Sequence, residues 1–475
     1  MSSQKSCGSF WSEGRIDMNR KTSLLALVII FAFSLSAYSA TLTINVPAPN
    51  GTDDTVVLQA ALDDCVAHGP GCTVQLTAGT YKSTQLFAEN FHGTFKGKGM
   101  DVTIIQALPL KGNPDNPCTL NPPSLGNPYP NLVTFLEGDI VVSDMTLKVV
   151  EPIPIPDGWY DLNGVFYTTL IFALLDFRGE LRMNVVVERV GLDGEAGLIA
   201  GPKFEPYPLA SQLPGTFRIS SCRLINSIIG IWVDSLRDAR VTIGGSASAG
   251  NFIANVVAAG YLLDLSNSKV EISHNNSSCG GAAWACFVAY QEQSVELPTS
   301  YLIDHNSLKP SGSLEDGIGI VDFGPPFGMG KKADAVISNN DIVIGPSADG
   351  SAFAGIETVF TEGTVIWNNR ITGSGLFGIT VEGSTKCKLI LNNVNGVTAD
   401  TARIGLMTYP SVLDGSPIPT TDSLVVGSGG KANVLDEGIN NKVVGLNIMH
   451  CDGPGKDIRD LMKHRIEGFN SWHKH

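Results

Sequence analysis

Four aspartates follow short apolar stretches of the sequence and are the residues best suited to acid–base chemistry. Asp234 and Asp264 are 30 residues apart, and Asp176 and Asp322 lie 58 residues before and after this pair. If about 30 residues form one repeating unit, these aspartates occupy equivalent places, and Glu382 extends the series. Because adjacent strands lie about 4.8 Å apart, we expect Asp234 and Asp264 to bring two carboxylates close together.

Two stacked carboxylates admit three interpretations. They fit the acid and the nucleophile of a retaining glycosidase, with Asp234, Asp264 and Asp322 as the catalytic candidates. They also fit a cation site, with Ca²⁺ as the candidate ion, because stacked carboxylates repel each other unless they are protonated or bridged. The third interpretation is structural, since aspartates at strand ends commonly accept hydrogen bonds from turn amides. The sequence does not single out one set of metal ligands.

Aromatic residues close to these aspartates are candidate contacts for a sugar ring, which stacks well on a flat apolar surface. They are Trp232, Tyr261 and Tyr290, and Glu382 is a further polar candidate for substrate binding. Trp232 lies between two aliphatic residues, so we expect it to point outward from a strand whose other side chains face a core.

Asp304-His305 has the residue types of a catalytic pair but is weak evidence for one. The same two places in other repeats hold Ser273-His274, Ser338-Asn339 and Trp367-Asn368. The repeat itself therefore accounts for the pair. No phosphate-binding glycine loop and no Ser-His-Asp order stands out either.

Two repeated motifs indicate the elements that position these residues. In the first, an Ile is followed three residues later by an Asn, and successive asparagines are 31, 34, 29 and 24 residues apart: Asn275, Asn306, Asn340, Asn369 and Asn393. In the second, a Gly precedes an alternating strand: Gly230, Gly260, Gly319, Gly355, Gly378 and Gly405. Two motifs at one period predict a solenoid of stacked β-coils. We expect each Asn to take a left-handed conformation at a turn and to bond its equivalents in neighbouring coils.

The segment 50–81 carries a family resemblance. It runs from Asn50-Gly-Thr-Asp-Asp54 through an amphipathic stretch to Ala78-Gly-Thr-Tyr81 and, with the repeats, resembles the N-terminal cap of the pectin lyase-like superfamily. The resemblance implies an all-β fold, a single-stranded right-handed parallel β-helix (solenoid) with an N-terminal helical cap. We expect Val56, Ala60 and Cys65 to cover the open end of the stack, and Asp53 or Asp54 to cap the helix.

The resemblance also implies a polysaccharide partner and a lyase or hydrolase activity, although the motifs of particular members are missing. The Asn-Thr-Asp, Gly-His-Gly and Arg-Ile-Lys units of polygalacturonases are absent from the repeat positions, as is the Asp-Pro-His-Asp run of alginate epimerases. A pectate lyase would need an Arg base that nothing in the spacing selects. The alternative function is a non-catalytic surface, adhesive or scaffold protein.

The net charge limits the possible partners of the protein, and the cysteines indicate its compartment. The net charge of −14 argues against nucleic acid and against a negatively charged membrane surface. Cys65 with Cys72, and Cys279 with Cys286, each enclose a short loop and are the expected disulfides. The pairing of Cys118, Cys222, Cys387 and Cys451 stays open.

Three segments follow from these patterns. Residues 1–40 contain a basic start, an apolar run and small residues typical of a signal peptide, and residues 1–17 lie upstream of a second candidate start, Met18. Residues 41–455 form the β-helix domain, including the cap at 50–81. Residues 456–475 form a C-terminal capping helix or tail. We therefore expect a secreted or periplasmic protein without a membrane span, of an oligomeric state that the sequence does not indicate.

Overall fold

The structure is a computed structural model. It describes residues 41–108, 131–149, 173–194, 196–202, 213–256, 259–279, 283–291, 298–310, 314–322, 334–345, 352–398, 403–411, 416–428 and 433–449. The expected signal peptide at 1–40 and the expected C-terminal cap at 456–475 lie outside these residues. No helix among the described residues is both long enough and apolar enough to cross a membrane.

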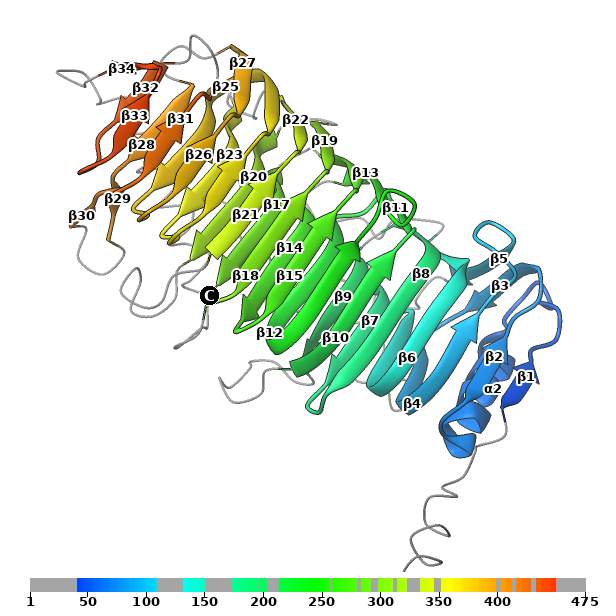
Figure 1. The fold of residues 1–475 in the computed structure, drawn as a ribbon. Coiled ribbons are helices and arrows are strands. Elements are labelled where there is room, and N and C mark those ends of the chain that lie inside the picture. Colours follow the sequence, from blue (N-terminus) through cyan, green and yellow to red (C-terminus); the bar gives the residue numbers. More distant parts are fainter. Residues whose placement is uncertain are drawn as a thin grey trace, which may run out of the picture. The chain divides into compact units, whose positions relative to one another are not determined.

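Short parallel strands dominate the chain from Leu42 onward and lie side by side in coil after coil (Figure 1). We number three strips of paired strands as sheets 1, 2 and 3, in the order in which each coil visits them. Some strands turn a corner and belong to two sheets: β4 (Leu86–Lys96), β8 (Met183–Asp193), β12 (Ile229–Gly244) and β25 (Arg370–Glu382). Strand β6 (Val133–Lys148) turns two corners and belongs to all three sheets.

The remaining strands each belong to one strip. Sheet 1 also contains β7 (Ala173–Gly179), β9 (Ala196–Pro202), β14 (Ala259–Ser266), β17 (Ala283–Gln291), β20 (Leu314–Asp322), β23 (Ala352–Val359), β28 (Ile404–Met407), β32 (Asn433–Asp436) and β34 (Asn447–Met449). Sheet 2 also contains β1 (Leu42–Asn45), β2 (Cys72–Gln75), β10 (Leu213–Ser220), β15 (Lys269–Ser273), β18 (Ser300–Asp304), β21 (Asp334–Ser338), β24 (Val365–Trp367), β26 (Lys388–Ile390), β31 (Leu424–Val426) and β33 (Lys442–Val444). Sheet 3 also contains β3 (Gly79–Ser83), β5 (Thr103–Ala107), β11 (Arg223–Ile225), β13 (Phe252–Val256), β16 (Asn276–Cys279), β19 (Ser307–Pro310), β22 (Asp341–Ile344) and β27 (Asn393–Thr398).

The strand pairing has the pattern of a right-handed parallel β-helix. One coil runs from β14 in sheet 1 to β15 in sheet 2 and β16 in sheet 3, and the next coil begins with β17, which pairs in parallel with β14. The same step repeats along the stack. Outside it, β29 (Tyr409–Pro410) and β30 (Pro417–Ile418) form a small antiparallel pair. The expected all-β solenoid is confirmed.

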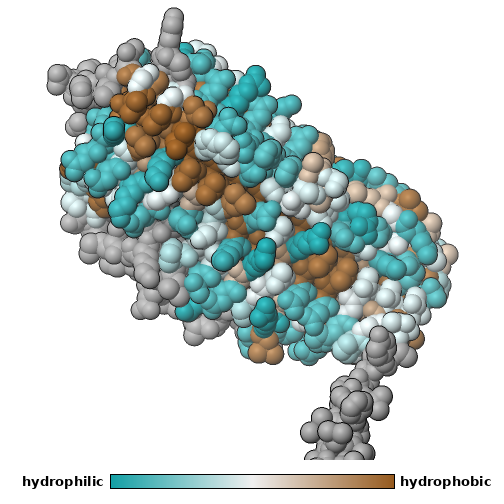
Figure 2. Space-filling model, viewed as in Figure 1, coloured by the Kyte–Doolittle hydropathy of each residue, from teal (hydrophilic) through white to brown (hydrophobic). Residues whose placement is uncertain are grey.

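Alternation along each strand places the aliphatic and phenyl side chains inside the coils. One continuous core of buried residues runs from Val46 to Val434. Phenyl rings stack within it, as Phe135 does on Phe177 with ring centroids 5.8 Å apart. In the view of Figure 2, hydrophobic residues also form a band along the stack that hydrophilic residues border.

Buried asparagines bond from coil to coil at the corner between sheets 2 and 3. Each side-chain amide donates to the next Asn Oδ1 at 2.9–3.0 Å, in the order Asn251, Asn275, Asn306, Asn340, Asn369 and Asn392. Two expectations were wrong in detail. Asn392 takes the place expected for Asn393, because Leu389 replaces Ile as the core residue paired with Ile366. From Asn275 onward the left-handed residue is the one before each Asn, such as His274 with φ 60°.

Glycines stand where sheet 1 begins, because the backbone there passes very close to neighbouring atoms. A Cβ on Gly230 would lie 2.6 Å from the Gly260 carbonyl oxygen, and one on Gly260 would lie 2.8 Å from Cys279 Sγ. Tyr261, the residue after Gly260, pairs with Phe287, and Phe287 pairs with Ile318. The equivalent of Gly260 in the coil of β20 is therefore Gly317, the residue before Ile318. The sequence-based choice of Gly319 was therefore wrong by two residues, and so was that of Gly405, which pairs with Thr380 rather than with Gly378.

Helix α2 (Thr55–His68) packs on the first coils through Leu58, Ala61, Leu62 and Cys65. Val56, 83% exposed, and Ala60 face solvent, so the expected packing face was wrong except for Cys65. Asp53 Oδ1 accepts the Thr55 backbone N–H at 2.9 Å at the helix start. Both expected disulfides, Cys65–Cys72 and Cys279–Cys286, are present.

The other cysteines divide between described and undescribed parts of the chain. Cys222 is buried outside any disulfide, and burial raises the pKa of its thiol to about 12. Cys387 is buried as well. Cys118 and Cys451 lie outside the described residues.

Candidate functional site

The outer face of sheet 1 carries most of the residues that the sequence nominated. Val233 and Leu263 belong to the core, so the residues that alternate with them, Trp232 and Asp264, point away from it. We name two rows of outward positions that cross successive strands. The tryptophan row contains Thr134, Asp176, Ile199, Trp232, Leu262, Val288, Gly319, Glu357 and Thr380. The acid row contains Arg178, Asp234, Asp264, Tyr290, Val321, Val359 and Glu382.

Asp234 and Asp264 lie opposite each other in neighbouring coils. The register of β12 against β14 shifts between Val233 and Leu236, so that Asp234 and Ser235 both face Asp264 across the strands. Such a bulge re-aims the side chains at the point where it occurs. Ser235 Oγ donates to Asp264 Oδ2 at 3.4 Å. The side chain of Asp234 lies outside what the structure describes.

Tyr290 and Glu382 join the same row, and Asp322 does not. Tyr290 pairs directly with Asp264, and Glu382 pairs with Val359 farther along. Val321 occupies the row in β20, and Asp322 pairs with Gln291 one residue beyond it. The expected place of Asp322 beside the other aspartates was wrong, because Gly317 rather than Gly319 sets the register of this coil. The side chains of Tyr290 and Asp322 lie outside what the structure describes.

Asp176, the fourth aspartate of the series, belongs to the tryptophan row and forms a buried ion pair. Arg178 Nε donates to Asp176 Oδ1 at 2.7 Å, and Asn131 Nδ2 donates to Oδ2 at 2.6 Å. Arg178 stands at the position that Asp264 holds in its own coil. The pair satisfies both carboxylate oxygens and has a structural explanation.

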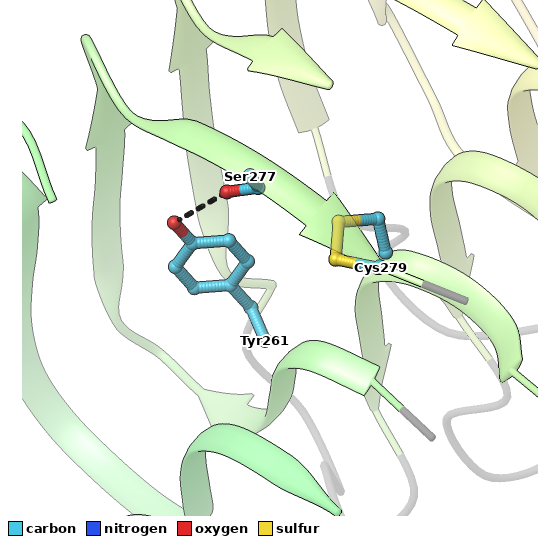
Figure 3. The surroundings of a disulfide bond; sticks show 4 residues. Tyr261, Ser277 and Cys279 are labelled. Atoms are coloured by element: carbon cyan, nitrogen blue, oxygen red, sulfur yellow. Dashed lines mark hydrogen bonds between the residues drawn. A yellow bond between two sulfur atoms is a disulfide. The ribbon is translucent and has the colours of Figure 1, made fainter. Parts of the chain in front are cut away.

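Tyr261 lies inside the coil, which removes it from the expected sugar-binding surface. Its ring stacks on Phe287 with centroids 4.2 Å apart, and its hydroxyl and Ser277 Oγ are 3.1 Å apart (Figure 3). The disulfide between Cys279 and Cys286 lies beside this ring. Burial raises the pKa of the Tyr261 hydroxyl, although the hydrogen bond with Ser277 opposes that shift. Tyr261 is therefore a core residue.

Carboxylates are concentrated on this face to a degree that the sequence did not reveal. Among the described residues, the buried acidic side chains other than Asp54 in the N-terminal cap all lie on the outer side of sheet 1: Asp176, Asp264, Asp316, Glu357 and Glu382. Sequence reasoning missed Asp316 and Glu357. Glu357 follows Gly355 by two residues, just as Trp232 follows Gly230, and this spacing was the available signal.

Polar atoms of the tryptophan row are buried without a hydrogen-bond partner. They are Trp232 Nε1, Thr134 Oγ1 and Thr380 Oγ1. Trp232 is 5% exposed and packs among small and aliphatic residues of the same face: Ala173, Ala196, Ile199, Ile229, Ala259 and Leu262. Each such group costs about 1–3 kcal/mol when it is left unsatisfied, so their occurrence in one row calls for an explanation.

The face is closed to solvent in this structure, with Asp264 3% exposed. Within the described part of the chain, no group of three or more His, Cys, Asp or Glu side chains is placed to hold a metal ion. The acid row contains carboxylates that could transfer protons or bind a cation together with a ligand. The candidate ion Ca²⁺ stays a prediction from the sequence.

Solved structures similar to this chain include a bacterial enzyme module, a surface adhesin and a phage protein. The A-module of mannuronan C-5 epimerase AlgE6 from Azotobacter vinelandii is 15% identical, with 86% of this chain and 100% of the module covered and a TM-score of 0.44. PfbA, a surface adhesin of Streptococcus pneumoniae, is 13% identical over 79% of this chain and 94% of its own, with a TM-score of 0.43. Gene product 12 of bacteriophage phi29, in its pre-mature form, is 12% identical over 90% and 54%, with a TM-score of 0.49.

No model of a known protein family matches the sequence, and no curated protein matches it significantly. The likenesses to solved structures are too distant to carry an argument about function. The parallel pairing of three strips of strands, coil after coil, identifies the chain as a right-handed parallel β-helix protein.

Proposed function

We propose that this chain is an exported protein that binds a polysaccharide along the outer face of sheet 1 and cleaves it through Asp234 and Asp264. The observation that carries the proposal is that three polar groups of the tryptophan row, Trp232 Nε1, Thr134 Oγ1 and Thr380 Oγ1, are buried without a hydrogen-bond partner. A sugar chain offers hydroxyl and ring oxygens at every residue, and these accept hydrogen bonds from an indole N–H or a threonine hydroxyl.

The acid row supports a cleavage step. In hydrolysis one carboxylic acid protonates the oxygen of the glycosidic bond, while the second carboxylate attacks the anomeric carbon or activates the water that does so. Asp234 and Asp264 face each other across a strand pair whose spacing is about 4.8 Å, which suits the closer, retaining arrangement. Tyr290 follows Asp264 in the acid row, and in this proposal it contacts the same sugar.

A second candidate function is a non-catalytic binding or scaffold protein. The burial of Asp264, at 3% exposure, favours it, because a carboxylate closed to solvent does not meet a polymer until the face opens. If only a fraction of the molecules is open, the apparent association constant equals that of the open form multiplied by this fraction. Polysaccharide binding without products would point to this function.

A screen of the purified protein tests the proposal. Uronate and neutral polysaccharides are incubated with and without Ca²⁺, and binding, unsaturated products and new reducing ends are measured separately. We expect one class of polysaccharide to be bound and cleaved, Asp264→Asn to abolish cleavage while binding persists, and Trp232→Ala to weaken binding. Absence of binding to every polysaccharide would overturn the proposal.

Phe252→Ala serves as the control in the same screen. Phe252 is an aromatic residue of sheet 3 that is 45% exposed, so its loss removes an aromatic ring without touching sheet 1. We expect this variant to bind and cleave as the wild type does. An equal loss of binding in Phe252→Ala and Trp232→Ala would mean that binding is not localised to sheet 1.

A further inference from the structure

A line of planar side chains runs along the corner between sheets 2 and 3. His274, His305, Asn339 and Asn368 occupy one turn position on four successive coils, each with φ between 53° and 60°. The left-handed conformation lets the chain turn sharply there, and the Asn that follows each of these residues points into the core. We name these four residues, together with Asp304 and Trp367, the turn strip.

Mutual contacts hold the turn strip in order. The rings of His274 and His305 are parallel within 2° with centroids 5.0 Å apart. His305 Nδ1 lies 2.6 Å from Asp304 Oδ2, and Asn339 Nδ2 donates to Asp304 Oδ1 at 2.9 Å. Asn368 Nδ2 donates to Asn339 Oδ1 at 2.8 Å. Side chains that are already fixed lose little conformational entropy when a ligand binds them.

The electrostatic character of the turn strip is mild. Burial raises the pKa of Asp304, but hydrogen bonds from Ser338, Asn339 and His305 outweigh that effect and hold the pKa below its usual value. The carboxylate therefore stays ionised beside the imidazole of His305. None of the six residues is Lys or Arg, which makes the strip a poor match for nucleic acid or for an acidic peptide.

The turn strip is open to solvent, unlike the face of sheet 1. The side chain of His305 is 52% exposed and Trp367 is 43% exposed. Trp367 pairs with Ser338 at the end of β24, directly before Asn368. An exposed indole beside ordered amides and an imidazole combines a stacking surface with donors and acceptors at a repeat of about 4.8 Å along the stack.

We propose that the turn strip is a second binding surface for a polysaccharide, separate from sheet 1. The chain lies along the stack, with one sugar ring stacked on Trp367 and hydroxyl groups bonded to the amides of Asn339 and Asn368 and to the free ring nitrogen of His305. This surface binds without cleaving, and it does not depend on the acid row.

Binding by single variants tests the turn strip. Affinities for soluble polysaccharides are measured by calorimetry for the wild type, Trp367→Ala, His305→Ala, Trp232→Ala and the exposed-aromatic control Phe252→Ala. We expect Trp367→Ala to weaken binding about three- to ten-fold, in line with the loss of one aromatic stacking contact, and Phe252→Ala to leave it unchanged. Circular dichroism checks that each variant is folded.

The outcomes separate this inference from the proposed function. Weaker binding in Trp367→Ala and His305→Ala, with Trp232→Ala also affected, supports both surfaces. Loss in Trp367→Ala but not in Trp232→Ala supports the turn strip and counts against sheet 1. Wild-type affinity in both Trp367→Ala and His305→Ala overturns the turn strip, whatever Trp232→Ala does. If Trp367→Ala is unfolded, Trp367→Ser, which removes the ring and takes the residue that the paired position Ser338 holds, replaces it and is expected to lose affinity to the same extent.

Discussion

Asn340 occupies the middle of the buried asparagine row, and its replacement by Ala should be strongly destabilising. Its Oδ1 accepts from the backbone N–H and the side-chain amide of Asn306 at 2.9 and 3.0 Å, and its Nδ2 donates to Ile303 O and Asn369 Oδ1, both at 2.9 Å. Asn340→Ala removes all of these bonds and leaves two buried donors of Asn306 without an acceptor. At about 1–3 kcal/mol for each unsatisfied group, the free energy of unfolding should fall by about 2–6 kcal/mol.

Guanidinium denaturation followed by circular dichroism measures this loss, and Asn368→Gly is the matched control. Asn368 is exposed, lies in an adjacent coil and donates a single bond to Asn339. Because Gly adopts the left-handed conformation of this position without strain, the replacement should cost under about 1 kcal/mol. Hydrogen exchange should show faster opening of the Asn306 amide in Asn340→Ala. Equal stability of the two variants would refute the view that the buried asparagines hold the coils in register.

Three further outcomes follow from the structure. Arg178→Met should lower the free energy of unfolding by about 3–5 kcal/mol because it removes the cation that pairs with the buried Asp176. The double variant Asp176→Leu/Arg178→Met should recover most of the loss in the same denaturation assay. The folded-state pKa of Asp304 lies below its usual value. The ionised carboxylate therefore contributes to stability above about pH 4, and this contribution disappears as the pH falls through the folded-state pKa. In acid denaturation, the difference in stability between the wild type and Asp304→Asn should shrink accordingly. Gly355→Ala should cost about 1–3 kcal/mol, since its Cβ would lie 2.9 Å from the Gly378 carbonyl oxygen and still closer to Ile371, and a thermal melt that matches the wild type would contradict this steric argument.

The solenoid could be predicted from the sequence because its two repeated motifs have separate physical causes. The Asn motif reflects a buried amide at a turn, and the Gly motif reflects the close approach of the backbone where sheet 1 begins. The period alone therefore indicated stacked coils. The outward position of Trp232 followed from strict alternation along one strand.

Register was harder to predict wherever a motif occurred twice within a few residues. Gly317 and Gly319 both fit the glycine motif, and only the pairing of Ile318 with Phe287 decides between them. That choice moved Asp322 out of the acid row. In the same way Asn392 and Asn393 were equivalent by type, and the core position of Leu389 decides for Asn392.

Burial on the outer face could not be read from the strands that form it. Alternation predicts that Asp264 and Trp232 point away from the core, but it does not predict that both are buried. The prediction that Tyr261 contacts a sugar was wrong for a different reason. Tyr261 directly follows Gly260, and the residue at this place of each coil points into the core.

The most direct test of the binding account observes the indole N–H groups of the tryptophans during titration with a polysaccharide. In a protein labelled with ¹⁵N at the indole nitrogens, Trp232→Phe and Trp367→Phe assign the two resonances. The account predicts that the Trp232 resonance shifts on binding, because the sugar supplies the acceptor that Trp232 Nε1 lacks, and that the Trp367 resonance shifts as well. A polysaccharide that binds while the Trp232 resonance stays unchanged would contradict the assignment of the site to sheet 1.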